Sequence, residues 1–284
     1  MVKVFQALSS GSSILKKAGS SSPRLDAELI LGFVLNWDRI KIMTEGESEL
    51  SGAEYESFLR YIEDRAKGMP IAYITGHKEF MGLDFYIEPG VLIPRADTEV
   101  IAETVIRECK SIDGQVSIAD VGCGSGAIGI SIAHYVKYAF VTMMDISDSA
   151  VEISNKNADL NHVKERVKII KGNLMEPVAK EEFDFVVSNP PYIRTDVIQS
   201  LQRDVRDFEP HIALDGGRDG LKYYRQITMS ASTCIKAGGM LVYEIGFDQG
   251  KAVADIMLRA GFSNINVLKD LAGMDRCIIG KKIC

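Results

Sequence analysis

The sequence has 284 residues, of which 46% are hydrophobic and 25% are charged, and this allows one large domain or a medium domain beside a small one. Its 33 basic and 39 acidic side chains give a formal net charge of −6, a balance that argues against a large nucleic-acid-binding face. No stretch approaches the roughly 18 apolar residues of a membrane span, and the polar start "MVKVFQALSSGSSILKKAGS" lacks the apolar core of a signal peptide.

The cysteines and histidines indicate neither a disulfide framework nor a metal site. The five cysteines are odd in number and include no CxxC pair, so a reducing, cytoplasmic compartment is predicted. The four histidines lie far apart and form no HExxH motif, and no metal is therefore expected.

Residues 1–68 are predicted to form a small helical domain. One helix begins with Ser22 as its N-cap and Pro23 in its first turn, and another begins at Ser51, where Glu54 completes a capping-box pattern, and ends at Gly68. Apolar residues at helical spacing predict the buried faces of these helices. The faces consist of Leu25, Leu29, Ile30 and Phe33 in the first helix and Tyr55, Phe58, Leu59 and Ile62 in the second.

Residues 69–94 are rich in β-forming residues broken by glycines and are predicted to form a β-hairpin linker. In residues 95–284, hydrophobic strands alternate with helices. Strands are predicted at 115–121, 139–145, 166–171, 183–188, 239–246, 265–270 and 275–280, and helices at 97–110, 126–136, 147–161, 248–260 and after residue 220. This alternation predicts an α/β domain with a mostly parallel sheet of seven strands, covered on both faces. The last strand is expected to run against the others, because only a short turn separates it from the strand before.

A glycine-rich loop follows the first of these strands and opens a helix. Gly122, Gly124 and Gly126 let the backbone turn tightly and let a ligand approach the main chain at a helix N-terminus. Gly124, Gly126 and Gly129 also fit the pattern GxGxxG, and Asp145 follows about twenty residues later, so a nicotinamide or flavin dinucleotide is one candidate ligand. A purely structural turn is another interpretation.

The acid that ends the same strand favours a third ligand. Asp120 is a poor neighbour for a pyrophosphate, but it suits an ammonium group such as that of the methionine part of S-adenosylmethionine. Asp145, which ends the next strand, can accept hydrogen bonds from both ribose hydroxyls. The acid-x-Gly-x-Gly-x-Gly pattern resembles the first motif of class I methyltransferases, which implies S-adenosylmethionine as the cofactor and a Rossmann-like sheet.

The segment "SNPPYI" ends strand 183–188 and is predicted to meet the glycine loop, because ligands bind beyond the carboxyl ends of the strands in an open α/β sheet. A planar NH2 group is a poor nucleophile and must be held by both hydrogens to attack a methyl group. The side-chain oxygen of Asn189 and the carbonyl oxygen of Pro190 can accept these hydrogens. Pro190 and Pro191 fix the backbone direction, and Tyr192 offers a flat face for stacking. A plain strand end, where prolines stop pairing, is the simpler alternative.

Asn-Pro-Pro-Tyr after such a domain resembles the amino-group methyltransferases that act on adenine, cytosine or glutamine nitrogens. Further segments are similar to the peptide chain release factor glutamine methyltransferases, the HemK/PrmC family; they are "FMGLDFYIEPGVLIPRADTE", "VRDFEPHIALDGGRDGLKYYRQI", "YEIG" and "DLAGMDRCIIG". The similarity runs in family order from about residue 23 to the C-terminus. It implies that class 1 release factors are the protein substrate and that the side-chain amide of the glutamine in their Gly-Gly-Gln loop is methylated, with S-adenosyl-L-homocysteine as the other product.

The resemblance also implies a role for each matching position. The loop that would wrap the methionine part of the cofactor consists of Gly122, Cys123, Gly124, Ser125 and Gly126. Asp145 would hold the ribose, and Asn173 and Leu174 would lie beside the adenine. The residues that would bind the glutamine amide are Asn189, Pro190, Pro191 and Tyr192, and Asn189 would also adjoin the cofactor. The segment that would close over the site contains Pro94, Arg95 and Thr98.

The chain departs from the family pattern at three positions. Asn173 stands where aspartate is frequent, which weakens a charged contact with the adenine amine. Cys123 stands where threonine is common and is expected to be a small packed side chain, and Ala96 replaces a frequent proline. His211 is expected to be structural or solvated, and Glu244 to be a buried acid without an assigned chemical role.

Two other functions share part of this pattern. A nucleic-acid amino methyltransferase acting on adenine would use the same Asn189–Tyr192 segment, but it would need a basic recognition surface. A dinucleotide oxidoreductase or a non-catalytic cofactor-binding regulator would not need Asn189 and Tyr192. For the protein substrate, the helical domain 1–68 is expected to help in docking.

Overall fold

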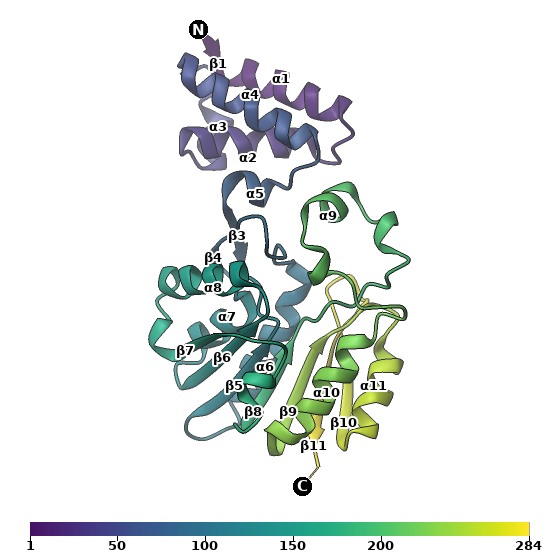
Figure 1. The fold of residues 1–284 in the computed structure, drawn as a ribbon. Coiled ribbons are helices and arrows are strands. Elements are labelled where there is room, and N and C mark those ends of the chain that lie inside the picture. The colour runs from purple at the N-terminus through teal and green to yellow at the C-terminus, as the bar shows by residue number, and fades with distance from the viewer. Residues whose placement is uncertain (284) are drawn as a thin grey trace. The chain divides into compact units, whose positions relative to one another are not determined.

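The computed structural model describes residues 1–283, which form two compact units. The first unit contains Met1–His77 together with Gln202–Phe208, and the second contains Lys78–Leu201 together with the chain from Glu209 onward (Figure 1). Within residues 1–283, none of the helices is both long enough and apolar enough to cross a membrane.

The first unit is built mainly from helices. They are α1 (Val4–Lys17), α2 (Pro23–Leu35), α3 (Arg39–Thr44), α4 (Gly52–Ala66), α5 (Ile71–Thr75) and α9 (Arg203–Phe208). Two short strands, β1 (Val2–Lys3) and β2 (Glu49–Leu50), pair antiparallel. Helices α1 and α4 approach closely at Gly11, where a Cβ atom would meet the ring of Phe58 at 2.6 Å. Both predicted helix starts are confirmed, since Ser22 precedes α2 and the Ser51–Glu54 capping box opens α4.

The buried face of α2 differs from the predicted one. Ile30 is fully buried as expected, but Leu25, Leu29 and Phe33 are 37%, 39% and 42% exposed. Helix α2 carries apolar residues on two faces, and the face with Ala27, Ile30 and Leu31 is the one that packs into the core. Periodicity alone does not decide between two apolar stripes. In α4 the predicted stripe is confirmed, with Phe58 and Ile62 fully buried.

A hairpin precedes the sheet of the second unit. Strands β3 (His77–Phe80) and β4 (Leu83–Tyr86) pair across Met81 and Gly82, which have φ values of +55° and +72°. Positive φ at both loop residues is the geometry of a type I′ turn, which matches the twist of paired strands. Asn157 fixes the end of the hairpin, because its side chain accepts a hydrogen bond from Tyr86 N at 2.7 Å and donates one to Tyr86 O at 3.0 Å.

The second unit contains a sheet of seven strands, as predicted. The strands are β5 (Val116–Val121), β6 (Ala139–Asp145), β7 (Val167–Lys171), β8 (Phe183–Ser188), β9 (Ile235–Glu244), β10 (Phe262–Lys269) and β11 (Asp275–Lys282). Their order is β10-β11-β9-β8-β5-β6-β7. Strand β11 runs antiparallel to both β9 and β10, while β5 to β9 are mutually parallel, so the predicted reversal of the last strand is confirmed.

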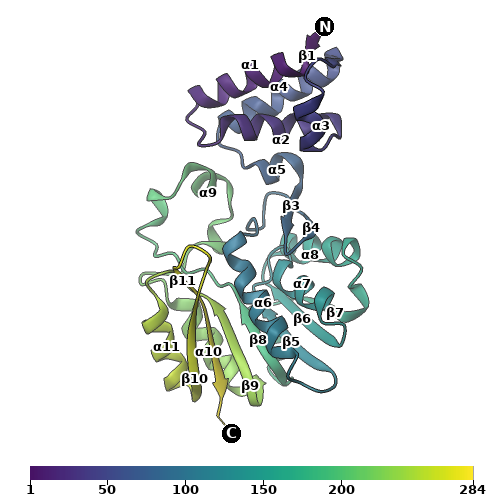
Figure 2. The ribbon, with the colours of Figure 1, turned by 180° about the vertical axis from the view of Figure 1, so that it is seen from behind.

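Helices cover both faces of this sheet. They are α6 (Glu99–Cys109), α7 (Ala127–Tyr135), α8 (Asp148–Leu160), α10 (Lys222–Cys234) and α11 (Gly250–Arg259), and a 3₁₀ turn, η1 (Ala96–Thr98), precedes α6. Figure 1 shows α10 and α11 in front of β9 and β10, and Figure 2, from behind, shows α6 in front of β8 and β5. Because β5, β6, β7 and β8 are parallel, their carboxyl ends meet at one edge of the sheet. This edge is where a ligand is expected.

Candidate active site

A cavity lies at the carboxyl edge of the parallel strands. Each of four strands contributes the residues that follow it, namely Gly122–Ser125 after β5, Asp145–Ser147 at the end of β6, Gly172–Leu174 after β7 and Ser188–Pro191 at the end of β8. The segment before α6 also lines the cavity with Pro94, Arg95 and Thr98. The structure therefore brings together most of the residues that the sequence assigns to the site. Asp120, Gly126 and Tyr192 are not among the lining residues.

The glycine loop needs glycine for its backbone conformation. Gly122, Gly124 and Gly126 have φ values of +72°, +57° and +83°, a region that side chains disfavour. A Cβ atom at Gly122 or Gly124 would meet nothing within 4 Å, so these two positions leave room beside the main chain. At Gly126 a Cβ atom would lie 2.7 Å from Ile130, so this glycine also permits close packing at the start of α7.

Asp120 is buried behind the loop, at 1% exposure. Its Oδ2 accepts a hydrogen bond from Gly129 N at 3.0 Å, in the first turn of α7, whereas Oδ1 has no partner among residues 1–283. Burial raises the pKa of Asp120 to about 7, and the nearby charge of Asp145 adds to this effect. A buried carboxyl oxygen without a partner is costly to keep charged, so this position fits a ligand that brings a positive group or a hydrogen-bond donor.

Asp145 ties the glycine loop to the end of β6. Its Oδ2 accepts from Gly124 N at 2.9 Å and its Oδ1 from Ser147 N at 2.9 Å. Each carboxylate oxygen has a second lone pair, so the half-buried group retains acceptor capacity toward the cavity. Further along the edge, the exposed Asn173 donates to Glu176 Oε1 at 2.7 Å, and Leu174 takes a positive φ of +49°.

Cys123 is a packed side chain, as expected from its position. Its Sγ lies 3.5 Å from Ser154 Oγ, and its side chain is 8% exposed. Burial raises the pKa of the Cys123 thiol well above its ordinary value, and the charges of Asp120 and Asp145 act in the same direction. The thiol therefore stays protonated and is a poor nucleophile.

Asn189 and Pro190 lie where β8 ends, at the wall of the cavity. The amide nitrogen Nδ2 of Asn189 donates to Thr98 Oγ1 at 3.3 Å. This bond engages the nitrogen end of the amide, so the oxygen end is the one available to a substrate N–H. Pro190 is buried and, like every proline, keeps a carbonyl acceptor while lacking an N–H donor.

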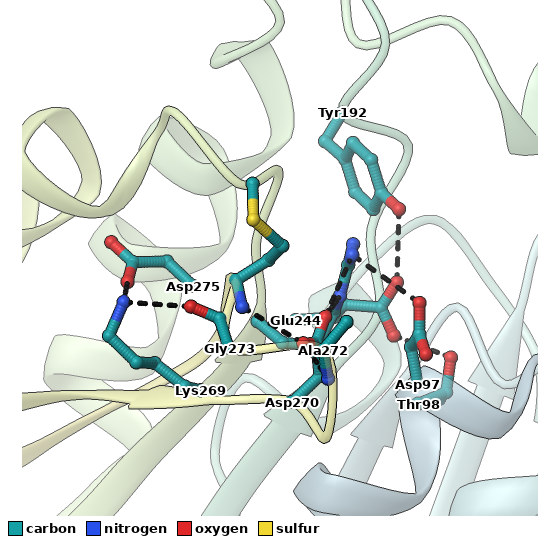
Figure 3. Close-up of polar contacts among 11 residues, drawn as sticks. Asp97, Thr98, Tyr192, Glu244, Lys269, Asp270, Ala272, Gly273 and Asp275 are labelled. Atoms are coloured by element: carbon teal, nitrogen blue, oxygen red, sulfur yellow. Dashed lines mark hydrogen bonds and ion pairs between the residues drawn. The ribbon is translucent and has the colours of Figure 1, made fainter.

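Tyr192 has partners that the sequence did not indicate. Its hydroxyl donates to Glu244 Oε1 at 3.1 Å (Figure 3). Its carbonyl accepts from Gln249 Nε2 at 3.0 Å. The stacking role of the ring stays a prediction. Glu244 is the buried acid expected at the end of β9, and its 2% exposure agrees with that expectation. The sequence feature that pointed to Glu244 was an acidic side chain at the C-terminal end of a strand inside the sheet.

The glycine-rich segment after Ala213 braces the Asn189–Tyr192 segment from the other side. Ile193 N donates to Leu214 O at 3.0 Å, and Gly216 N donates back to Ile193 O at 2.7 Å. A Cβ atom at Gly216 would lie 2.7 Å from Tyr192 Cα, so only glycine fits this approach. The bracing function of this segment was not predicted from the sequence.

The segment before α6 is tied down by a second buried acid. Glu209, 5% exposed, forms an ion pair with Arg95 and accepts from Ile93 N at 3.3 Å. Arg95 lines the cavity, so this ion pair fixes one part of its wall. Within residues 1–283, no three histidine, cysteine or acidic side chains are grouped so that they could hold a metal ion.

Comparison with known proteins agrees with this geometry. Residues 96–205 match the family model described as "Methyltransferase small domain", and residues 6–76 match the "PrmC N-terminal domain". A solved methyltransferase from Pyrococcus furiosus shares the fold with a TM-score of 0.53 at 19% identity, over 73% of this chain and 92% of that one. Fold and cavity together define a class I methyltransferase that uses S-adenosylmethionine.

Relatives of high identity identify the family. A release factor glutamine methyltransferase from Clostridium acetobutylicum is 45% identical over 98% of this chain and 98% of its own length. Another from Moorella thermoacetica is 42% identical over 96% of both chains. The chain belongs to the release factor glutamine methyltransferase family, and it is a protein-(glutamine-N5) methyltransferase.

Proposed function

We propose that this enzyme methylates the side-chain amide nitrogen of the glutamine in the Gly-Gly-Gln motif of class 1 release factors. One nitrogen–hydrogen bond of the glutamine amide is replaced by a nitrogen–carbon bond, and one proton is released. The observation that carries this proposal is the orientation of Asn189 at the cavity wall, with its nitrogen turned toward Thr98 and its oxygen available as an acceptor. A primary amide offers two N–H donors to such a site.

The protein residues contribute to the reaction by orienting the substrate amide. We propose that the Asn189 side-chain oxygen and the Pro190 carbonyl each accept one hydrogen of the substrate amide, so that the nitrogen lone pair points into the cavity. Bound S-adenosylmethionine supplies a methyl group on a positively charged sulfur, which is a good leaving group. Alignment of two reactants can be worth roughly 7–11 kcal/mol, so the site needs no strong base to be effective.

The same geometry supports a proposal for the residues that bind the cofactor. We propose that the loop Gly122–Gly126 surrounds the methionine part, because Gly122 and Gly124 leave room beside the main chain. The unpartnered oxygen of Asp120 fits the ammonium group, either directly or through a water molecule. Asp145 retains lone pairs for the ribose hydroxyls, and Asn173 and Leu174 lie along the edge assigned to the adenine.

The direct test is methyl transfer from labelled S-adenosylmethionine to purified class 1 release factor. Native factor and a factor with Gln→Ala in the Gly-Gly-Gln motif serve as acceptors, with DNA in the same reaction. Label on the native factor alone is the expected result. Label on DNA would replace the proposal with an adenine methyltransferase, which shares Asn189–Tyr192 but is disfavoured by the net charge of −6. The protein would act in the cytoplasm, where release factors work.

The helical domain 1–68 is proposed to dock the protein substrate. The exposed side chains of Leu25, Leu29 and Phe33 form an apolar stripe on α2 that the core of this unit does not use. The variant Leu25→Ser/Leu29→Ser is expected to raise the KM for intact release factor about tenfold, equivalent to about 1.4 kcal/mol, and to leave methylation of a short Gly-Gly-Gln peptide unchanged. Leu258→Ser, at an exposed leucine of α11, is the control. Equal loss on factor and peptide would contradict docking by this stripe.

A further inference from the structure

Asn189 is the last member of a chain of hydrogen bonds that begins at a buried carboxyl. Glu244 accepts from Thr98 Oγ1 at 2.5 Å on one oxygen and from Tyr192 Oη at 3.1 Å on the other, as Figure 3 shows. Thr98 Oγ1 in turn accepts from Asn189 Nδ2 at 3.3 Å. Glu244 and Thr98 are 2% and 4% exposed, so solvent competes little for these bonds.

The number of hydrogens in this chain determines its direction. An ionised carboxylate can only accept, so both Thr98 and Tyr192 must point their single hydroxyl hydrogen at Glu244. Thr98 Oγ1 then has only lone pairs left. The group beside it must therefore be a donor, and Asn189 can satisfy it only with its NH2 end.

A proton on Glu244 allows the chain to reverse. A neutral carboxyl can donate to Thr98 Oγ1, and the hydrogen of Thr98 is then free to point at Asn189. When it does so, the Asn189 amide turns its oxygen toward Thr98 and presents its NH2 group to the cavity. Two NH2 groups facing each other form no hydrogen bond, so a substrate amide would not be held.

We propose that Glu244 and Thr98 are positioning residues, and that the negative charge of Glu244, transmitted through the Thr98 hydroxyl, keeps the Asn189 oxygen directed at the substrate amide. This inference rests on the proposed function, because it takes an amide NH2 as the group to be bound. It assigns a role in the reaction to a glutamate that lies outside the Asn-Pro-Pro-Tyr segment.

The groups around Glu244 shift its pKa in opposite directions. Burial raises the pKa of Glu244, whereas the hydrogen bonds from Thr98 and Tyr192 and the charge of Arg276 lower it. Arg276 itself pairs with Asp270 at 3.2 Å and with Asp97 at 3.4 Å. The titratable or charged groups around Glu244 are Asp97 on η1, Tyr192 after β8, Tyr224 on α10, and Arg276 and Cys277 on β11. Arg276 is the cation among them and favours the ionised state.

The first test compares Glu244→Gln with the wild type. The introduced glutamine carries no negative charge, and when its oxygen accepts from Tyr192, its NH2 end faces Thr98 and reverses the chain as a proton would. We expect kcat at saturating cofactor to fall about 10- to 100-fold, with the Kd for S-adenosylmethionine and the KM for release factor changed less than about threefold. A wild-type kcat in Glu244→Gln would overturn the proposal.

Variants of Thr98 separate this role from a packing role. Thr98→Ser keeps the hydroxyl and should retain kcat within about threefold, whereas Thr98→Val should lose as much as Glu244→Gln. The double variant Glu244→Gln/Thr98→Val should be no slower than either single variant, because both break one chain. A serine variant as slow as the valine variant would show that Thr98 acts through packing alone.

The pH profile and a spectrum of the free enzyme complete the test. Wild-type kcat should fall on the acid side as Glu244 takes up a proton, and this limb should be absent in Glu244→Gln. The Asn189 side-chain NH2 signal in a ¹⁵N spectrum, assigned by its loss in Asn189→Asp, should shift with the same midpoint in the wild type and not in Glu244→Gln.

This signal needs no acceptor protein, so it separates two kinds of failure. If the signal titrates as expected but no release factor is methylated, the proposed function fails and the hydrogen-bond chain stands. If methylation proceeds while the signal is identical in the wild type, Glu244→Gln and Thr98→Val, the positioning role is overturned.

Discussion

The cofactor end and the substrate end of the cavity differ in the sequence separation of the residues that hold them in place. The glycine loop is tied by side-chain hydrogen bonds that span 21, 30 and 32 residues. The Asn189–Tyr192 segment is tied by bonds that span 52, 57 and 91 residues. The cofactor end is thus organised within the continuous stretch from β5 to α8. The substrate end depends instead on residues from η1, from β9 and from the position before α11, which meet only when the sheet is assembled.

This difference suggests how the two ends respond to mutation. Changes far from Asn189 in the sequence can disturb methyl transfer while cofactor binding survives. Changes in the glycine loop should show the opposite pattern. The following variants test this separation, beginning with the largest expected effect.

Asn189→Ala should lower kcat the most, by about 100- to 1000-fold, because it removes a preorganised acceptor of the substrate amide. The Kd for S-adenosylmethionine should change by less than about threefold. Steady-state kinetics with release factor and calorimetric titration with the cofactor measure the two quantities. If the Kd rises as much as kcat falls, Asn189 serves the cofactor and the two ends are not separate.

Gly216→Ala should disturb the substrate end, although Gly216 lies well after the Asn189–Tyr192 segment in the sequence. The new Cβ would lie 2.7 Å from Tyr192 Cα and 2.8 Å from Pro191 O, so the segment has to shift. A displacement of this kind is expected to lower kcat about tenfold or more, with the cofactor Kd unchanged. Gly52→Ala is the matched control, because a Cβ there meets nothing within 4 Å. Unchanged kcat in Gly216→Ala would show that the brace is dispensable.

Gly124→Ala should disturb the cofactor end instead. Gly124 has a φ of +57°, which costs a side chain roughly 1–2 kcal/mol, so the Kd for S-adenosylmethionine should rise about tenfold while kcat at saturation is kept. Gly114→Ala carries a similar backbone cost at φ +92°, away from the cavity, and should lose stability without losing affinity. An equal rise of Kd in both variants would indicate general destabilisation.

Asp120→Asn should change the pH dependence of stability. The folded chain keeps the Asp120 proton up to a pKa of about 7, whereas the unfolded chain loses it near the ordinary value of 3.8. The unfolded state therefore binds fewer protons between these values, and the stability contributed by this group falls as pH rises through the window. The variant should gain on the order of 1–4 kcal/mol over the wild type at about pH 8 and little at about pH 4, measured by urea unfolding without cofactor. A constant difference at all pH values would contradict the raised pKa.

Cys123→Ser should have the smallest effect. The thiol is packed and its pKa is raised by burial, so neither acid–base chemistry nor nucleophilic attack is expected from it. We expect kcat and the cofactor Kd to change by less than about threefold, and Cys123 of the wild-type enzyme to resist alkylation at neutral pH. Rapid inactivation by iodoacetamide that Cys123→Ser abolishes would show that the thiol is reactive.

Much of the fold was predictable, because its signals are local. Strand–helix alternation indicated the seven-stranded sheet, and the short turn before β11 indicated its reversed direction. The buried face of α2 was not predictable in full, because the helix has apolar residues on two faces and only packing against α1 and α4 chooses between them.

The site shows the same division between local and long-range signals. The glycine loop and Asp145 are recognisable in a single stretch of sequence, and the structure places them together at the cavity. Glu244 was expected to be buried, but nothing near it in the sequence indicates a link to Asn189 through Thr98. That link exists only because β8, β9 and η1 end at the same place.

The position of β11 between β9 and β10 has a consequence for local unfolding. Among the described residues, β10 pairs within the sheet only with β11, so an opening that separates β11 from both of its neighbours also exposes the amides of β10 to hydrogen exchange. Arg276 lies on β11 and leaves the neighbourhood of Glu244 in the same event. The glycine loop, on β5 and α7, need not open with it. In mild denaturant, exchange of β10 and β11 amides should therefore mark the loss of methyl transfer, at concentrations where S-adenosylmethionine still slows exchange around β5.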